Sequence, residues 1–452
     1  MSLMSLEEKL RQLRKAVDKS SSDRALEQQL ETLRRLGQRR DAASSSITDI
    51  TLDATWNGAP RSPCGVEECI EGRIEQHELG QFFLANQSLP FGRPYGKFRI
   101  ADISSADLTP LNLFLGSATL PDPSRLIFLD TETTGLAVDG SAYAFLIGVG
   151  AIEDTQFVVR QYFLRDETDE KAALFALSKA LESYEGLITF NGRIFDVPLL
   201  EARYAACCLQ PPFSRLVHLD LLHPARQLWK LRLEKCHLTN LERHVLGIAR
   251  DGDVPGSEIP GIYFDYLRAG DARGLQPVFF HNALDVVSLA ALTVEVAEIL
   301  QSAREGNRSL PGLDLFSLSR IFERVGAVEL SASICDQALS AGLPEALEPR
   351  ALWHLARQHK RLRRFDAAAE IWLNLARRET PYALDAYREL VIHYERRQRD
   401  AQTALQFTDA ALALLHSGSF PSSKDEASAR HLERFMRRRQ RLQKRLNAAK
   451  TG

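Results

Sequence analysis

The chain has 452 residues, of which 44% are hydrophobic and 26% are charged, with a formal net charge of −2. This balance is ordinary for globular proteins, the length suggests two to four domains of roughly 100–200 residues, and any nucleic-acid surface must be local. No signal sequence and no run of about 18 apolar residues is visible, and the cysteines have no zinc-site spacing, so we expect a cytoplasmic protein without a membrane segment.

The first part of the chain divides into two segments. Residues 1–47 carry leucines at helical spacing and predict a helical or coiled segment. Two interpretations remain open, a short coiled coil or a helix that packs on its own domain. Residues 48–120 are rich in Gly and Pro with short apolar runs, which indicates a strand- and turn-rich lead-in.

Residues 121–304 alternate between apolar patterns typical of strands and apolar patterns typical of helices. Strands are predicted at "LIFLD" (126–130), "AYAFLIGVGAIE" (142–153), "QFVVRQYFL" (156–164), "GLITFN" (186–191) and "RLVHLDLL" (215–222). Helices are predicted over 169–184, 197–208, 238–247 and 277–300. Three hairpin-type strands followed by strand–helix alternation indicate an α/β fold, a mixed sheet flanked by helices.

Residues 305–418 change to an all-helical pattern. Leu355 aligns with Leu390 and Phe365 with Arg399, at offsets of 35 and 34 residues. That period is typical of tetratricopeptide-like helical repeats, which often form a docking surface for a protein partner. A degenerate earlier copy is expected over 315–342.

Residues 419–452 predict a basic C-terminal helix. Its arginines and lysines can grip a phosphate backbone, or the helix can cap the repeats with a solvated face. Both interpretations remain open at this stage.

Carboxylates and their neighbours follow the predicted strands in an unusual order. Asp130 and Glu132 lie two apart at a strand end and therefore point to the same face. Asp196 follows a later strand, and His281 and Asp285 lie four apart on a helix and share a face. Taken singly, these are a solvated strand end, a helix N-cap and a helix-surface pair.

The same residues would form a functional site if they converge at the carboxyl ends of the strands, where sheets of this type bind their ligands. Four carboxylates in one cleft would repel one another strongly without cations. Two divalent ions about 4 Å apart would relieve that repulsion. Oxygen ligands favour Mg²⁺ or Mn²⁺ over zinc.

The three motifs resemble those of the DEDD exonuclease superfamily, which has a ribonuclease H-like fold. "DTETTGL", "NGRIFD" and "HNALD" are similar to its first, second and third motifs. Together "FLIGVG", "FNGRIFDVPLL", "HLDLLHPARQLW" and "GDVPGSEIP" resemble the YprB-type ribonuclease H-like domain of bacteria. The resemblance covers about residues 80 to 302, with the motifs in order.

The resemblance implies a two-metal-ion nuclease that hydrolyses phosphodiester bonds of single-stranded RNA or DNA, with 3′–5′ exonuclease polarity expected. It implies metal ligands Asp130, Glu132, Asp196 and Asp285, with His281 as a further catalytic residue. One departure concerns His281, which stands at the spacing that the superfamily uses for tyrosine. Two other functions remain open, an endonuclease of the same fold and a non-catalytic nucleic-acid-binding or scaffold protein.

Four residues are expected to bind the substrate. Asn191 and Arg193 would orient the scissile phosphate. Arg226 and Trp229 would guide a single strand, Arg226 by its positive charge and Trp229 by stacking on a base. The alternative for this stretch is a helix whose Trp229 is buried.

Overall fold

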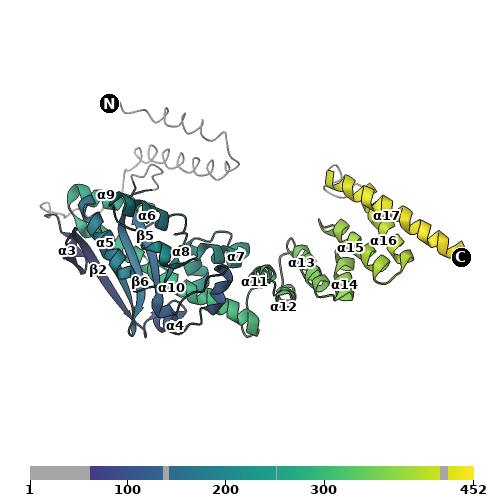
Figure 1. Ribbon diagram of the computed structural model, residues 1–452, viewed down its shortest axis with the longest axis horizontal. Helices are drawn as coiled ribbons and strands as arrows, with labels where there is room; N and C mark the ends of the chain where they lie inside the picture. Colours follow the sequence, from purple (N-terminus) through teal and green to yellow (C-terminus); the bar gives the residue numbers. More distant parts are fainter. Residues whose placement is uncertain (1–61, 136–141, 251, 418–425, 452) are drawn as a thin grey trace, which may run out of the picture. The chain divides into compact units, whose positions relative to one another are not determined.

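The computed structural model describes residues 62–135, 142–250, 252–417 and 426–451 (Figure 1). The helical segment predicted for residues 1–47 lies outside this part. The predicted fold class is confirmed: a mixed seven-stranded sheet flanked by helices is followed by a largely helical region. In the described part of the chain, no helix has the length and apolar character needed to cross a bilayer.

The main sheet has the strand order β1-β2-β7-β6-β5-β8-β9. Strands β5, β8 and β9 run parallel, and the remaining neighbours pair antiparallel. The strands of this sheet are β1 (Gly72–His77), β2 (Gly80–Pro90), β5 (Leu126–Thr133), β6 (Ala144–Glu153), β7 (Gln156–Phe163), β8 (Gly186–Thr189) and β9 (Val217–Asp220). A separate small hairpin joins β3 (Pro94–Tyr95) to β4 (Phe98–Arg99).

The segment expected as a lead-in contributes two strands to this sheet. β2 pairs with β7, Leu84 standing opposite Tyr162, and β1 pairs with β2. The local pattern indicates strands there, but the paired residues of β2 and β7 lie 66 to 80 residues apart in the chain and leave no local signal.

Helices cover both faces of the sheet. They are α3 (Val66–Cys69), α4 (Ile100–Ser105), α5 (Glu170–Leu181), α6 (Asp196–Ala206), α7 (Leu222–Leu233), α8 (Leu238–Leu241), α9 (Ile259–Ala269) and α10 (Gln276–Glu305). A π-helical turn over Glu242–Leu246 continues α8 and ends at Gly247, whose φ is 70°. Helix α9 was not expected from the sequence.

Strand β5 divides its side chains between the two faces. Ile127 and Leu129 lie in the core that α5 and α6 form on one face. Leu126 and Phe128 lie in the core on the other face, which contains residues of α7 and α10. By this alternation Asp130 and Glu132 project to the α10 face, and Thr131 to the α6 face.

Six helices follow α10 as successive neighbours (Figure 1). They are α11 (Gly312–Arg324), α12 (Val328–Ser340), α13 (Glu348–Arg361), α14 (Phe365–Ala376), α15 (Ala383–Arg396) and α16 (Ala401–His416). The first residues of α13 and α15 are 35 apart (383 − 348), which agrees with the period read from the sequence.

The basic C-terminal helix, α17 (Glu426–Thr451), packs against this region. Phe435 and Leu442 are buried in a core shared with α15 and α16. Arg439 pairs with Asp409, and Arg441 with Glu395. These contacts fit the capping interpretation, since the helix covers apolar residues of its neighbours.

Candidate metal centre

Asp130 and Glu132 are positioned by strand β5 beneath helix α10. Asn282 of α10 donates from Nδ2 to Oδ2 of Asp130 at 3.0 Å. Its Oδ1 accepts a hydrogen bond from Gln161 on β7 at 3.0 Å. A Cβ at Gly148 would lie 2.2 Å from Asn282 Oδ1, so only glycine on β6 lets α10 approach this closely.

Asp196 reaches the same region from the opposite face of the sheet. It is the first residue of α6, which begins just past the end of β8. Thr131 projects toward α6, and its Oγ1 donates to Oδ1 of Asp196 at 2.5 Å. The alternation of β5 therefore brings Asp130 and Glu132 to one side of Thr131 and ties Asp196 to the other.

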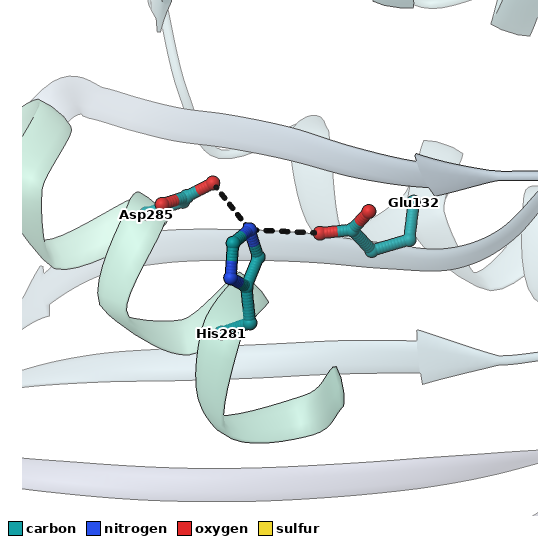
Figure 2. Close-up of side chains that lie close together, drawn as sticks. All are labelled: Glu132, His281 and Asp285. Atoms are coloured by element: carbon teal, nitrogen blue, oxygen red, sulfur yellow. Dashed lines mark ion pairs between the residues drawn. The ribbon is translucent and has the colours of Figure 1, made fainter. Parts of the chain in front are cut away.

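His281 lies between two carboxylates, as Figure 2 shows. Its Nε2 lies 3.4 Å from Oδ2 of Asp285 and 3.8 Å from Oε1 of Glu132. One ligand atom from each of these three residues lies within 4.8 Å of the others. The spacing of four residues on α10 places His281 and Asp285 on one face, and β5 supplies Glu132 opposite.

Asp253 fixes the orientation of the His281 ring. Both of its carboxylate oxygens lie 2.9 Å from Nδ1 of His281. An ionised carboxylate can only accept hydrogen bonds, so Nδ1 carries the proton. In the neutral ring, the lone pair of Nε2 then faces Glu132 and Asp285, as a proton acceptor or a metal ligand requires.

Arg250 joins this arrangement from the same loop as Asp253. Its guanidinium pairs with Asp285, Glu242 and Asp253, and its side chain is only 6% exposed. One nitrogen of Arg250 and one oxygen of Glu242 lack a hydrogen-bond partner. Arg250 is therefore a fixed cation beside Asp285.

Burial and mutual repulsion raise the pKa values of three carboxyl groups. Burial raises the pKa of Asp130 well above its usual range, and Asp285, Glu132 and Asp196 raise it further. Burial, with Asp285 and Asp196, raises the pKa of Glu132 to about 8. Burial also raises the pKa of Asp196 to about 6, although the Thr131 hydroxyl opposes this. The four predicted acids therefore interact electrostatically.

These residues suit a divalent cation. Carboxylates that are buried together repel one another, and a bound cation removes that penalty. Asp130, Glu132, Asp196 and Asp285 offer oxygen ligands, and His281 offers one nitrogen, a possible ligand that the sequence did not indicate. This is the candidate acidic site of the described residues.

The expected substrate residues have different surroundings. Asn191 and Arg226 both line a cavity of about 720 Å³. Arg193 is exposed and donates from Nη2 to the carbonyl of His218 at 2.5 Å. Trp229 is 1% exposed within the core beneath α7, so its ring is not accessible to a base and the buried alternative holds.

Several residues of the site were not found from the sequence. Asn282 lies inside the third motif, between His281 and Asp285, and polar character at a core-facing helix position was an available signal. Arg250 and Asp253 lie in a loop without periodicity, so their contacts with α10 have no local signature.

Metal-free protein should lose stability as pH rises. Folded Glu132 has its pKa raised from 4.5 to about 8, so between these values the folded state holds a proton that the unfolded state releases. The destabilising term is absent below about pH 4.5 and complete above about pH 8. Adding Mg²⁺ or Mn²⁺ should therefore raise Tm more at pH 8 than at pH 6, by on the order of a few degrees.

The measurement is Tm against pH with and without the cation, beside Glu132→Gln as the matched variant. The variant should show a flatter metal-free profile, because residue 132 no longer titrates. Equal cation shifts at pH 6 and pH 8 in the wild type would contradict this expectation.

Removing the Asp253 carboxylate should slow metal-dependent cleavage. Asp253→Ala leaves the His281 ring without its orienting acceptor, and such outer contacts are worth about 10–100-fold in affinity or activity. The cleavage rate with Mn²⁺ tests this, with Glu258→Ala, an exposed acid of the same loop region, as control. A rate equal to that of the control variant would show that Asp253 is not needed for the ring's position.

The family match agrees with the fold. Residues 127–297 match the RNase_H_2 family of the RNase H superfamily. The uncharacterized protein YprB of Bacillus subtilis (strain 168) is 27% identical over 294 residues, which cover 64% of this chain and 70% of that protein. A family B DNA polymerase structure from Pyrobaculum calidifontis aligns with a TM-score of 0.31 and 15% identity, over 54% of this chain and 30% of the polymerase.

Proposed function

We propose that the protein is a metal-dependent nuclease acting on single-stranded nucleic acid, and the match of residues 127–297 to a family of the RNase H superfamily supports this. The reaction is hydrolysis of a phosphodiester bond, with DEDD-type 3′–5′ exonuclease action. The observation that carries the proposal is the grouping of Glu132, His281 and Asp285 with two further acids, Asp130 and Asp196.

Four carboxylates would hold two Mg²⁺ or Mn²⁺ ions. Asp130, Glu132, Asp196 and Asp285 supply oxygen ligands, and such ions, when bound, polarise the phosphate and the attacking water. Burial raises the pKa values of Asp130, Glu132 and Asp196, so ionising these carboxyl groups is costly in the folded chain, and a bound cation would offset that cost.

The chain's own groups have distinct tasks. His281 accepts the proton of the attacking water at Nε2, while Asp253 holds Nδ1 and the ring orientation. Asn191, Arg193 and Arg226 orient the phosphate backbone.

A single strand suits the exposed apolar residues next to the site. Ile194 is 70% exposed and Phe195 is 48% exposed, and they are the two residues before Asp196. Phe280, 51% exposed, immediately precedes His281. Unpaired bases can stack on the rings of Phe195 and Phe280, whereas bases inside a duplex have no free faces.

We extend the proposal to the domain plan. The ribonuclease H-like domain spans 121–304, tetratricopeptide-like repeats span 305–418, and a basic C-terminal segment that contains α17 spans 419–452. The repeats offer a docking surface for a protein partner, in a cytoplasmic protein.

The test is a time course on 5′-labelled single-stranded RNA and DNA with Mg²⁺ or Mn²⁺. A 3′–5′ exonuclease yields a ladder of labelled products that shortens with time and leaves circular substrates intact. Cleavage of circles would instead support an endonuclease of the same fold. Binding of both strands without any cleavage would support the non-catalytic scaffold and contradict the proposal.

A further inference from the structure

Helix α7 has three faces with different uses. Leu228 and Trp229 are buried in the core. Arg232 pairs with Asp314 of α11 at 2.9 Å, which ties α7 to the helical region. The third face is a stripe at intervals of four residues, and its members, Leu222, Arg226, Lys230 and the following Glu234, all line the cavity of about 720 Å³.

The cavity is positively charged. Arg226 and Lys230 lie one helical turn apart on its wall, and Lys235 and His237 line it from the loop after α7. The positive charges of Arg226 and Lys230 oppose the rise in the pKa of Cys236 that burial causes. Within the described ranges, Arg226, Lys230 and Lys235 form no ion pair, and Glu234 is the one carboxylate of the lining.

Another part of the lining comes from the turn that precedes Asp196. Asn191 lines the cavity, has φ 67°, and donates its backbone N–H to Oδ1 of Asp220 at 2.7 Å. Oδ1 of Asp220 also accepts from the backbone N–H of Leu222 at 3.0 Å. One carboxylate therefore fixes these two parts of the lining relative to each other.

The turn itself is held tightly. A Cβ at Gly192 would lie 2.6 Å from Cβ of Thr189, so glycine is needed there. The chain then enters α6 at Asp196, five residues after Asn191. The cavity thus begins at the segment that also supplies a carboxylate of the metal centre.

We propose that this cavity binds backbone phosphates of the nucleic-acid strand, next to the nucleotide being hydrolysed. The inference rests on the proposed nuclease function and deepens it by assigning the path of the strand. Unpaired cations match phosphate charge, and the volume lies within the range of about 300–1,000 Å³ that is usual for ligand sites. Backbone phosphates carry no sequence information, so binding here should be independent of sequence.

The experiment measures binding without cleavage. Fluorescein-labelled 12-nucleotide single strands of DNA and RNA are titrated with the full chain in EDTA at several salt concentrations. The test variant replaces Arg226, Lys230 and Lys235 by glutamine. For single strands each phosphate neutralised contributes about 0.7 to the slope of log affinity against log salt, so the slope should fall by about 2.

A control variant replaces three exposed cations elsewhere by glutamine, namely Arg73, Lys179 and Arg268, each paired with a nearby acid. Its slope should equal that of the wild type. Equal Tm values for both variants show that the fold is kept. A test variant with the wild-type slope would overturn the assignment of the cavity while leaving the nuclease proposal standing.

A competition experiment distinguishes a site for a strand from a site for a free nucleotide. Adenosine 5′-monophosphate should compete far more weakly than an unlabelled 12-nucleotide strand, because it meets only part of the cavity. Equal competition would identify a mononucleotide site and contradict the strand path. If the salt slope falls in the test variant but the wild type hydrolyses no strand with Mg²⁺ or Mn²⁺, the phosphate-binding cavity is supported and the nuclease function is rejected. A wild type that binds no strand would reject both proposals.

Discussion

Replacing Asp130 by asparagine should abolish cleavage while leaving the fold intact. Asp285, Glu132 and Asp196 all raise the pKa of Asp130. Loss of this ligand removes several kcal/mol of charge stabilisation, so the rate should fall by at least about 10³-fold. The asparagine can still accept the hydrogen bond that Asn282 donates.

The same substitution should not lower the stability of the metal-free protein. A buried carboxyl group that repels three neighbours is replaced by a neutral group of similar size, so Tm at pH 8 should stay equal or rise. Cleavage rates and Tm are measured together, with Glu201→Gln, an exposed acid of α6, as control. Cleavage within tenfold of the wild type under Mg²⁺ would remove Asp130 from the site.

Short-range patterns in the sequence account for much of this site. Alternation along β5 predicts that Asp130 and Glu132 share a face, and the interval of four on α10 predicts the same for His281 and Asp285. The structure adds why Asp196 reaches them from the other face: Thr131 projects toward α6 and holds its carboxylate. That contact depends on the register of β5, which two-residue periodicity does predict, and on where α6 begins, which it does not.

Contacts between distant segments could not be predicted in the same way. Arg250 and Asp253 come from a loop, and their bonds to Asp285 and His281 depend on how that loop returns to α10. The pairing of β2 with β7 is a similar case. For Trp229 the sequence permitted two environments, since a basic amphipathic helix can present a ring to either side; packing of α7 against the sheet decides for the core.

His281 is the residue whose role is tested most sharply by substitution. As a general base it should be worth about 10²–10⁴-fold, so His281→Ala should lose that factor in rate. The geometry supports this role, because Asp253 holds Nδ1 and leaves the Nε2 lone pair facing Glu132 and Asp285. The spacing to Asp285, which the resemblance associates with tyrosine, supports an orienting role instead.

Two substitutions separate these roles. If His281 is the base, His281→Tyr should be nearly as slow as His281→Ala, because a phenol with a pKa near 10 is a poor acceptor at neutral pH in its protonated form. Added imidazole should restore part of the His281→Ala rate, since the small base can enter the space left behind. If His281 only orients the water, His281→Tyr should keep much of the activity and imidazole should have no effect.

A third possibility is that His281 acts as a metal ligand, and it needs a measurement other than rate. Mn²⁺ affinity should then fall in both His281→Ala and His281→Tyr, because neither side chain replaces the imidazole nitrogen. As a base, His281 can be removed with little change in affinity, since the four carboxylates remain. A large rate loss at unchanged Mn²⁺ affinity, together with imidazole rescue, assigns the proton transfer to His281; a parallel loss of rate and affinity assigns the ring to the metal.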